Sequence, residues 1–489
     1  MDVLIDYIGM ALGWISDNIV YINMLLAIVI IFFERREPST VWAWLLVLYF
    51  VPVLGFIIYL VLGQNMHKNR MFRIKEIEDE LNSQIKNQTA ELRYDIEMSE
   101  NEADKSYKEL IYYNLETSGV VYTEDNDVTI YTDGHEKFDA LIQEMENAKK
   151  YIHMQYYIIR DDELFDRIKE VLIRKAAQGV EVRILYDGMG CLEIGKKQWK
   201  MLRSNEIETA EFFPATLKKA HLRINYRNHR KIVVIDGEVG FVGGFNVGRE
   251  YLGLDKKFGY WRDTHMKITG SAVMGLQIRF LLDWNFAAGK NLFLEERYFQ
   301  QQQQKTGDTG IQIISSGPDS KWQSTRDNYV YLISHATDHI YIQTPYFIPD
   351  ETMLNTLKMA ASSGVDVRIM IPCKPDHPFV YWATYSYIGE MLKAGATCYT
   401  YDNGFLHTKG MCVDGKVCSY GTANFDIRSF KLNFEVNAVI YNERVTRQFE
   451  KIFLKDIEKS TKIASHKYAN RSLVIRVKEQ FSRLLSPIL

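Results

Sequence analysis

Two short segments of the chain carry the same set of residues that can transfer a phosphoryl group. Each segment reads His-x-Lys-x4-Asp-Gly, and an asparagine follows each histidine at the same distance. In chain order the members are His229, Lys231, Asp236 and Asn246, then His407, Lys409, Asp414 and Asn424. One His-x-Lys would be weak evidence, because a lone histidine on a strand is commonly a core residue. Two matched copies predict one composite active site assembled from two related halves.

These residue types fit phosphoryl chemistry. A neutral imidazole can attack phosphorus and carry the group covalently, and a second, protonated imidazole can give its proton to the leaving alkoxide. We expect the motif lysines and both asparagines to hold the non-bridging oxygens and to offset the charge that grows in the transition state. Asp236 and Asp414 complete the motifs as candidate catalytic residues, although a carboxylate before a glycine also fits a structural turn.

Each histidine needs one ring nitrogen fixed if the other is to present a lone pair or a proton correctly. The acidic candidates are Asp263, in the string WRDTHMK, and Glu435, in NFEVNAV. Asp263 lies farther beyond the asparagine of its half than Glu435 does, so the two halves are not strict copies here.

The rest of the catalytic region also repeats. YIHMQYYII at Tyr151 matches YIQTPYFIP at Tyr341, and GVEVRILYDG at Gly179 matches GVDVRIMIP at Gly364. Apolar, β-rich runs alternate with helical patterns, which is typical of an α/β sheet. We expect two pseudo-symmetric halves, each a β-sheet flanked by helices, with the site at their interface. A glutamine-rich polar segment predicts the boundary between the halves at residue 305.

Two charge-free apolar runs, Asn18 to Phe33 and Thr40 to Gly63, predict a two-helix transmembrane hairpin. The second is long enough for a membrane-spanning helix, which needs about 20 residues, and the first is slightly short. A cleaved signal peptide is the alternative, but Asp2 and Asp6 stand where it would have basic residues. Basic residues after the second run favour a multi-pass protein of the cell membrane with a cytoplasmic catalytic region.

The predicted organisation is a transmembrane hairpin over 1–64, a juxtamembrane helical linker over 65–115, a first half over 116–305 and a second half over 306–489. A basic run from Lys218 to Lys231 is either a solvated loop or a surface that attracts anionic phospholipid. The amphipathic stretch from Ser472 to Leu489 fits a helix in the lipid headgroup layer or a terminal helix packed on the domain.

Composition excludes some classes of function. The chain has 59 Lys and Arg against 62 Asp and Glu, a formal net charge of −3, and so lacks the chain-wide basic excess of a nucleic-acid footprint. We therefore expect no nucleic-acid partner. The five cysteines are an odd number without metal-ligand spacing, which is typical of reduced thiols. We also expect no metal and no cofactor, because Lys, Asn and His can supply the phosphate contacts.

The duplicated motif makes the chain resemble the phospholipase D superfamily and, within it, the membrane-anchored bacterial cardiolipin synthases. The supporting strings run over Thr40 to Gly63, Asn228 to Tyr251, Trp261 to Gly270, Ser315 to Ser320 and His407 to Phe430. The resemblance extends over essentially the whole chain.

This resemblance implies a reaction and a set of roles. A phosphatidyl group passes from one phosphatidylglycerol to another through a phosphohistidine, which gives cardiolipin and releases glycerol. His229 is implied as the nucleophile and His407 as the general acid and later base, while Asp263 and Glu435 each orient the histidine of their own half. Phosphatidylglycerol, cardiolipin, glycerol and the lipid bilayer are the implied partners, and an oligomer is compatible with the sequence.

Other readings of the same motifs stay open. The motifs also permit a hydrolase that releases phosphatidic acid, or a transferase that uses another alcohol such as serine. A non-enzymatic lipid-binding scaffold conflicts with the presence of both histidines, both lysines and both asparagines. The residues alone do not decide which histidine is the nucleophile.

Overall fold

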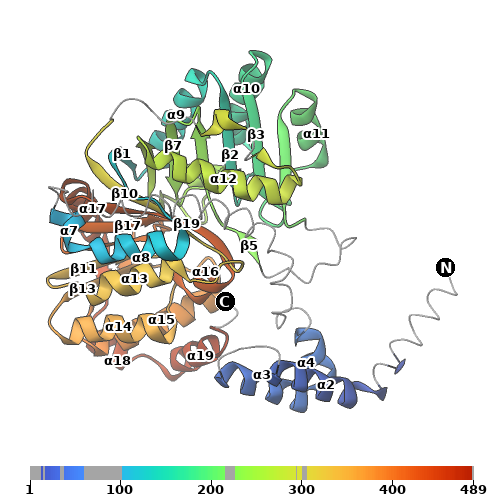
Figure 1. The fold of residues 1–489 in the computed structure, drawn as a ribbon. Coiled ribbons are helices and arrows are strands. Elements are labelled where there is room, and N and C mark those ends of the chain that lie inside the picture. The colour runs from blue at the N-terminus through green and yellow to red at the C-terminus, as the bar shows by residue number, and fades with distance from the viewer. Residues whose placement is uncertain are drawn as a thin grey trace. The chain divides into compact units, whose positions relative to one another are not determined.

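The computed structural model describes residues 13–14, 17–32, 38–59, 102–214, 226–292, 295–299 and 306–486 (Figure 1). The described residues up to 59 belong to a small compact unit, and those from 102 onward belong to a large one. The basic run at 218–231 lies largely outside the described residues, as does the predicted linker up to residue 101.

The small unit contains the helices α2 (Ile19–Phe32), α3 (Pro38–Phe50) and α4 (Pro52–Ile58). Pro52 has no N–H to give to the carbonyl of Leu48 four residues earlier, and that carbonyl instead accepts a 3.0 Å hydrogen bond from the Asn23 side chain. The prediction of one continuous helix over the second apolar run is therefore wrong. Among the described residues, none of the helices combines the length and apolar character needed to cross a membrane.

The large unit is built on one mixed sheet whose strand order repeats in mirror fashion on either side of a central pair, β1 and β10 (Figure 1). Outward from the centre, the first half contributes β1 (Thr123–Tyr131), β9 (His265–Thr269), β7 (Val239–Gly243), β6 (Ile232–Ile235), β2 (Tyr151–Tyr156), β3 (Glu181–Asp187) and β4 (Glu208–Phe212). The second half contributes β10 (Thr309–Ser316), β19 (Asn433–Tyr441), β17 (Val417–Gly421), β16 (Gly410–Val413), β11 (His339–Gln343), β13 (Asp366–Pro372) and β14 (Thr397–Tyr401), followed by β20 (Ser460–Lys462). The expected α/β fold with two pseudo-symmetric halves is confirmed.

Helices flank the sheet in both halves. The first half has α9 (Gly134–Asn147), α10 (Glu163–Ala177), α11 (Lys196–Ser204), α12 (Ala272–Ala288) and the 3-10 turns η2 (Arg249–Leu252) and η4 (Glu296–Tyr298). The second has α13 (Ser324–Ser334), α14 (Glu351–Ser362), α15 (Pro378–Lys393), α16 (Ile427–Lys431), α17 (Glu443–Ile457), α18 (Ser465–Ala469) and α19 (Leu473–Leu484).

Helix α10 shows why these segments are helical. The side chain of Asp162 caps its first turn by accepting from the backbone N–H groups of Leu164 and Phe165. Leu164, Ile168 and Leu172 then recur at helical spacing and are fully buried in the core of the first half.

Two short helices precede the sheet, α7 (Glu102–Ser106) and α8 (Lys108–Ser118). The sequence suggested a linker here, but Leu110 and Ile111 of α8 are fully buried in the hydrophobic core of the second half. The Asn114 amide also donates a 2.8 Å hydrogen bond to the Gln312 side chain of β10. The described end of this segment therefore packs as an integral layer of the second half.

The registers correct the repeat as read from the sequence. Tyr151 of β2 accepts the backbone N–H of Asp236, and the equivalent acceptor for Asp414 is His339. Gln155 pairs with the first residue of β6, and Gln343 pairs with the first residue of β16. Tyr151 thus corresponds to His339 and not to Tyr341, a shift of two residues. Side chains alternate with a period of two along a strand, so this shift preserves the inward and outward pattern and is invisible to it.

Candidate active site

Two very short parallel strand pairs cross from one half to the other and bring the motif histidines together. β5 (Arg227–Asn228) pairs with the start of β19, with Asn228 opposite Phe434. β15 (Phe405–Leu406) pairs with β8 (Trp261–Arg262), with Leu406 opposite Arg262. The residues that follow the first strand pair are His229 and Glu435, and those that follow the second are His407 and Asp263.

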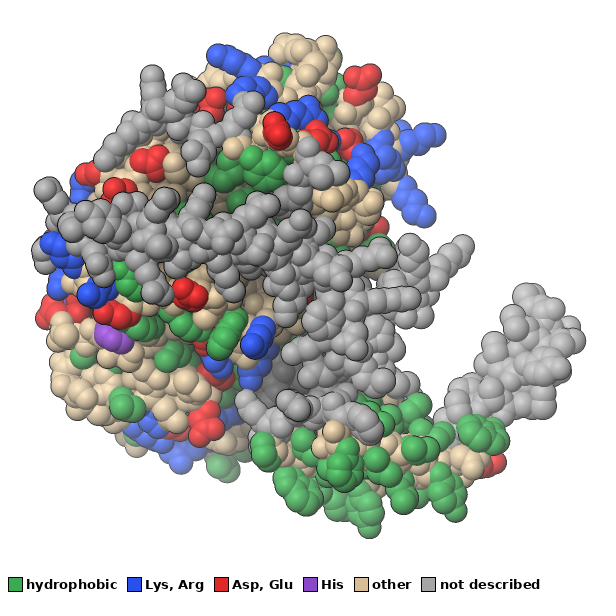
Figure 2. Space-filling model, viewed as in Figure 1, with side chains coloured by type: hydrophobic (Ala, Val, Ile, Leu, Met, Phe, Trp, Pro, Cys, Tyr) green, Lys and Arg blue, Asp and Glu red, His purple; other side chains and the backbone are tan. Residues whose placement is uncertain are grey.

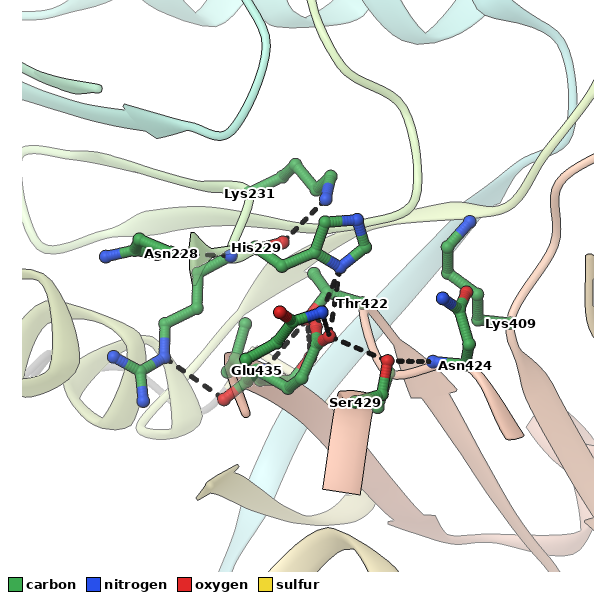
Figure 3. A network of polar contacts seen from close by, with 12 residues as sticks. Asn228, His229, Lys231, Lys409, Thr422, Asn424, Ser429 and Glu435 are labelled. Atoms are coloured by element: carbon green, nitrogen blue, oxygen red, sulfur yellow. Dashed lines mark hydrogen bonds and ion pairs between the residues drawn. The ribbon is translucent and has the colours of Figure 1, made fainter. Parts of the chain in front are cut away.

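The side chains follow this crossed backbone pairing. Nδ1 of His229 lies 3.0 Å from each carboxylate oxygen of Glu435 (Figure 3). Nδ1 of His407 lies 2.6 Å from Oδ2 of Asp263. Each histidine therefore contacts the acid of the other half, and the expectation that each acid serves its own half is wrong. The physical reason is that the motif histidines leave their own sheet register and pair across the boundary.

Burial sets the charge state of the dyads. Burial lowers the pKa of His229 to about 4, against the opposing charge of Glu435. Burial and the Lys409 charge lower the pKa of His407 to about 4 as well, against the opposing charge of Asp263. Both imidazoles are therefore neutral near neutral pH. Because a carboxylate can only accept, Nδ1 of His229 carries the proton of its ring and Nε2 keeps a lone pair. At His407 the Asp263 carboxylate favours the same arrangement, while Nζ of Lys409 also lies 2.8 Å from Nδ1.

Both acids are ionised in spite of their complete burial. Burial raises the pKa of Glu435, but His229 and Lys231 outweigh this and hold the pKa below its usual value. Burial likewise raises the pKa of Asp263, and Lys409 and His407 outweigh it. Each carboxylate can therefore fix its partner imidazole and stabilise a positive charge on it.

The motif lysines lie beside the histidines. Nζ of Lys231 donates a 2.6 Å hydrogen bond to the carbonyl of His229, and Nζ of Lys409 donates to the carbonyl of His407. Burial lowers the pKa of Lys409 to about 8 and that of Lys231 well below its usual value. An anion bound between the lysines would favour their charged forms.

The motif asparagines are buried in the same region. The Asn246 side chain accepts from the backbone N–H of Ile158 at 3.1 Å and donates to the Tyr251 hydroxyl at 3.0 Å. Oδ1 of Asn424 is buried without a hydrogen-bond partner among the described residues. A contact of these amides with phosphate stays a prediction.

The motif aspartates are not brought to the site. Asp236 and Asp414 lie in turns at the far ends of β6 and β16 from the histidines, with left-handed φ angles of 57° and 54°. The Asp236 carboxylate accepts the N–H groups of three successive residues, Lys149 to Tyr151, at 2.7–2.8 Å. Asp414 accepts those of Thr337 to His339 at 2.8–2.9 Å. A catalytic role for either aspartate is therefore corrected to a structural one.

Several supporting residues escaped the sequence analysis. Thr422 and Ser429 donate to Glu435 at 2.6 and 2.9 Å, within the network of Figure 3. A Cβ atom on Gly244 would lie 1.9 Å from a carboxylate oxygen of Asp263, so this glycine makes room for the acid. Thr422 and Gly244 each stand two residues before a motif asparagine, but nothing in the sequence indicates their carboxylate partners.

Two buried Arg–Asp pairs support the crossed strands. Arg230 bonds Asp283 at 2.6 Å and also donates to the backbone carbonyl of Glu435 at 3.1 Å. Arg262 bonds Asp456 at 2.8 Å and also donates to the Thr408 hydroxyl at 3.1 Å. In each case one guanidinium joins the two halves next to a dyad. Gln155 donates a hydrogen bond to Asp283, and the equivalent Gln343 donates one to Asp456. The repeat as read from the sequence was shifted by two residues and therefore did not align these glutamines.

This fold and this paired site define a protein of the phospholipase D type. The family model for the cardiolipin synthase, phospholipase D-like domain matches residues 141–260 and 329–457, one match in each half. The model for the phospholipase D-nuclease N-terminal segment matches residues 22–64.

Known relatives narrow the class. The major cardiolipin synthase ClsA of Bacillus subtilis is 50% identical over 96% of this chain and 97% of its own. A cardiolipin synthase of Listeria monocytogenes is 49% identical over 98% of this chain and 99% of its own. Phosphatidylserine synthase of Haemophilus influenzae, at 15% identity, shares the fold with a TM-score of 0.60 over 80% of this chain and 100% of its own. The chain belongs to the bacterial cardiolipin synthases of the phospholipase D superfamily, a family of phosphatidyltransferases.

Proposed function

We propose that this protein makes cardiolipin by transferring a phosphatidyl group from one phosphatidylglycerol to a second, through a phosphohistidine and with release of glycerol. The crossed pair of neutral, carboxylate-bound histidines carries this proposal. Two such imidazoles on one buried site supply both a nucleophile and a proton carrier.

The first step breaks the bond between phosphorus and the glycerol headgroup. Nε2 of His229 attacks phosphorus with its lone pair, and the P–O bond to the headgroup glycerol breaks. The departing oxygen takes a proton from Nε2 of His407, and glycerol leaves. Lys231 and Lys409 would donate hydrogen bonds to the phosphate oxygens during this step. The assignment of His229 as nucleophile comes from the family resemblance, because both histidines are buried, carboxylate-bound and lowered in pKa to about 4.

The second step forms the product and restores the enzyme. The terminal hydroxyl of a second phosphatidylglycerol gives its proton to His407 and attacks phosphorus, and the bond from phosphorus to His229 breaks. In the first step, His407 must be in its doubly protonated, positively charged form when the first alcohol leaves. Its pKa is about 4 in the empty site, but a bound phosphate anion adds negative charge beside it and favours the protonated form.

Association with the lipid bilayer is part of this proposal. Hydrophobic side chains gather on the surface of α2–α4 (Figure 2), where Tyr21, Met24, Phe32, Trp42 and Tyr49 are each well exposed. Monomeric soluble proteins rarely expose contiguous apolar patches of this kind. The side of the membrane on which the large unit lies stays a prediction.

Product identity tests the proposed function directly. Purified full-length protein is given isotope-labelled phosphatidylglycerol in mixed micelles, and the products are identified by mass spectrometry. Cardiolipin with an equal amount of free glycerol supports the transferase. Phosphatidic acid as the main product would make the protein a hydrolase, and turnover only after adding another alcohol would change the acceptor.

A further inference from the structure

The C-terminal helix α19 buries polar side chains and exposes apolar ones, the reverse of the usual pattern for a helix on the surface of a soluble domain. Its fully buried residues are polar, Glu479 and Ser482. Five of its large apolar residues are each more than half exposed, and they are Leu473, Val474, Val477, Phe481 and Leu484, whereas Ile475 is partly buried. A helix that packs on a domain normally buries its apolar stripe and exposes its charges. α19 does pack on the domain, against α15, but with most of its apolar side chains facing outward.

Specific contacts fix this orientation. The buried carboxylate of Glu479 forms two 2.6 Å hydrogen bonds with the guanidinium of Arg471, just before the helix. At the C-terminal end, the Tyr387 hydroxyl of α15 bonds Ser486 at 3.3 Å. Turning the apolar stripe inward would break the buried ion pair and leave a charge without its partner, which is strongly destabilising.

The exposed face continues beyond α19 and has basic edges. The ring of Phe379, an exposed residue at the start of α15, lies 6.3 Å from that of Phe481, and α15 and α19 lie side by side (Figure 1). At 100° per residue, Arg476 and Lys478 flank the apolar stripe on opposite sides, and both are exposed. The only acid of the helix is the buried Glu479, so its solvent-facing charges are all positive.

We propose that the exposed stripe of α19, together with Phe379, is a membrane-contact surface that lies in the headgroup layer of a bilayer containing anionic phospholipid. An apolar stripe between two rows of cations matches the layering of such a bilayer, with acyl chains at the centre and phosphate groups at the edges. This surface belongs to the large unit and is independent of α2–α4. The inference rests on geometry and charge and does not depend on the reaction proposed above.

Site-specific quenching in vesicles tests the contact without using catalysis. A cysteine replaces Val477 in the full-length protein carrying Cys373→Ser, because the other native cysteines are buried, and it receives an environment-sensitive fluorophore. The matched control places the label at Leu454, an exposed leucine of α17 in the same half. Both proteins are reconstituted in phosphatidylcholine vesicles with nitroxide-labelled lipid, with or without phosphatidylserine.

We expect severalfold stronger quenching at position 477 than at position 454, increased by phosphatidylserine and reduced by salt. Equal quenching at the two positions would overturn the proposal. So would energy transfer between two labelled copies at position 477 in detergent, because it would identify a second copy of the chain as the occupant. As a second variant, Val477→Asp with Phe481→Asp should abolish the quenching of a label placed at Leu484, whereas Leu454→Asp should leave the quenching of that label unchanged.

Discussion

The two half-sites contain the same kinds of residues but hold them differently. Glu435 is bonded by three side chains of its own half, Thr422, Ser429 and Asn433. Asp263 instead accepts the backbone N–H of Thr264 at 2.8 Å and the indole N–H of Trp261 at 3.4 Å, with Nζ of Lys409 3.9 Å away. The acid of the first half thus also has an ion-pair contact with a lysine of the second half, while the acid of the second half accepts from three side chains of its own half.

This difference has a consequence for function. Each half supplies the histidine of one dyad and the acid of the other, so neither half contains a complete dyad. The unequal supports also give the two histidines different surroundings, as a nucleophile and a proton carrier require. The comparison predicts that damage to either half disables both dyads, but by different routes.

Removing either histidine should have the largest effect. His229→Ala and His407→Ala should each reduce kcat by on the order of 10⁴-fold or more, as for other residues that act as one catalytic unit. The two variants should differ in what they accumulate. With a labelled phosphatidyl donor whose leaving group needs no proton, such as p-nitrophenol, His407→Ala should leave label on His229, whereas His229→Ala should retain none. The exposed His335→Ala is the matched control, and label trapped on His407 instead would reverse the assigned roles.

Neutralising the acids should separate the two crossed dyads. Glu435→Gln should slow formation of the phosphoenzyme by about 10²–10⁴-fold, because His229 loses its oriented tautomer and the charge that stabilises its cation. Asp263→Asn should act on proton transfer at His407, so that glycerol release and phosphoenzyme breakdown slow together. Rapid-quench measurements distinguish the two. If Asp263→Asn alone perturbed the ¹⁵N signals of His229, the crossed pairing would be refuted.

The sequence predicted which residues form this site better than it predicted which of them contact one another. Both motifs, the two related halves and the α/β alternation are local patterns with clear periods, and the histidines and lysines do lie close to the interface. The crossed pairing depends on β5 and β15, which are two residues long and bond to segments far away in the chain. No periodic pattern marks a two-residue strand, so residue types alone could not connect Glu435 to His229.

The N-terminal helices show a second limit of sequence reasoning. Hydropathy averages over a window, and the run from Thr40 to Gly63 is apolar throughout. One proline with a well-placed Asn23 is enough to divide it, because the hydrogen bond that Pro52 cannot make is replaced from another helix. The proline was visible in the sequence, but its replacement donor was not.

Breaking the buried Arg–Asp pairs should show how the halves are held together. Asp283→Ala and Asp456→Ala each leave a buried guanidinium without its carboxylate, which should lower the free energy of unfolding by about 3–5 kcal/mol. Asp139→Ala removes the exposed partner of Arg167 and should cost about 1 kcal/mol or less. Urea unfolding of the detergent-solubilised full chain measures all three. Similar losses for the exposed and buried pairs would contradict the supporting role.

The pH dependence should distinguish the lysines. Lys409 has a pKa of about 8 because of its burial, so the free enzyme loses this cation as pH rises through that value. We expect kcat/KM to fall about tenfold per pH unit above it, since kcat/KM reports groups of the free enzyme. Lys409→Arg stays charged and should show a flatter profile in whatever activity it retains. An unchanged fall in that variant would assign the titration to another group.

Replacing the motif aspartates should have the smallest effect on activity. This result would distinguish residues of the active site from residues that only stabilise the fold. Asn tolerates the left-handed backbone of Asp236 and Asp414 and keeps one acceptor oxygen, but it loses the charge that strengthens the bonds to three backbone N–H groups. Asp236→Asn and Asp414→Asn should therefore lower the free energy of unfolding by about 1–2 kcal/mol and leave kcat within about twofold. Because β6 and β16 separate each aspartate from its histidine, a loss of kcat without a loss of stability would be incompatible with the turn role, and would return these residues to the catalytic set.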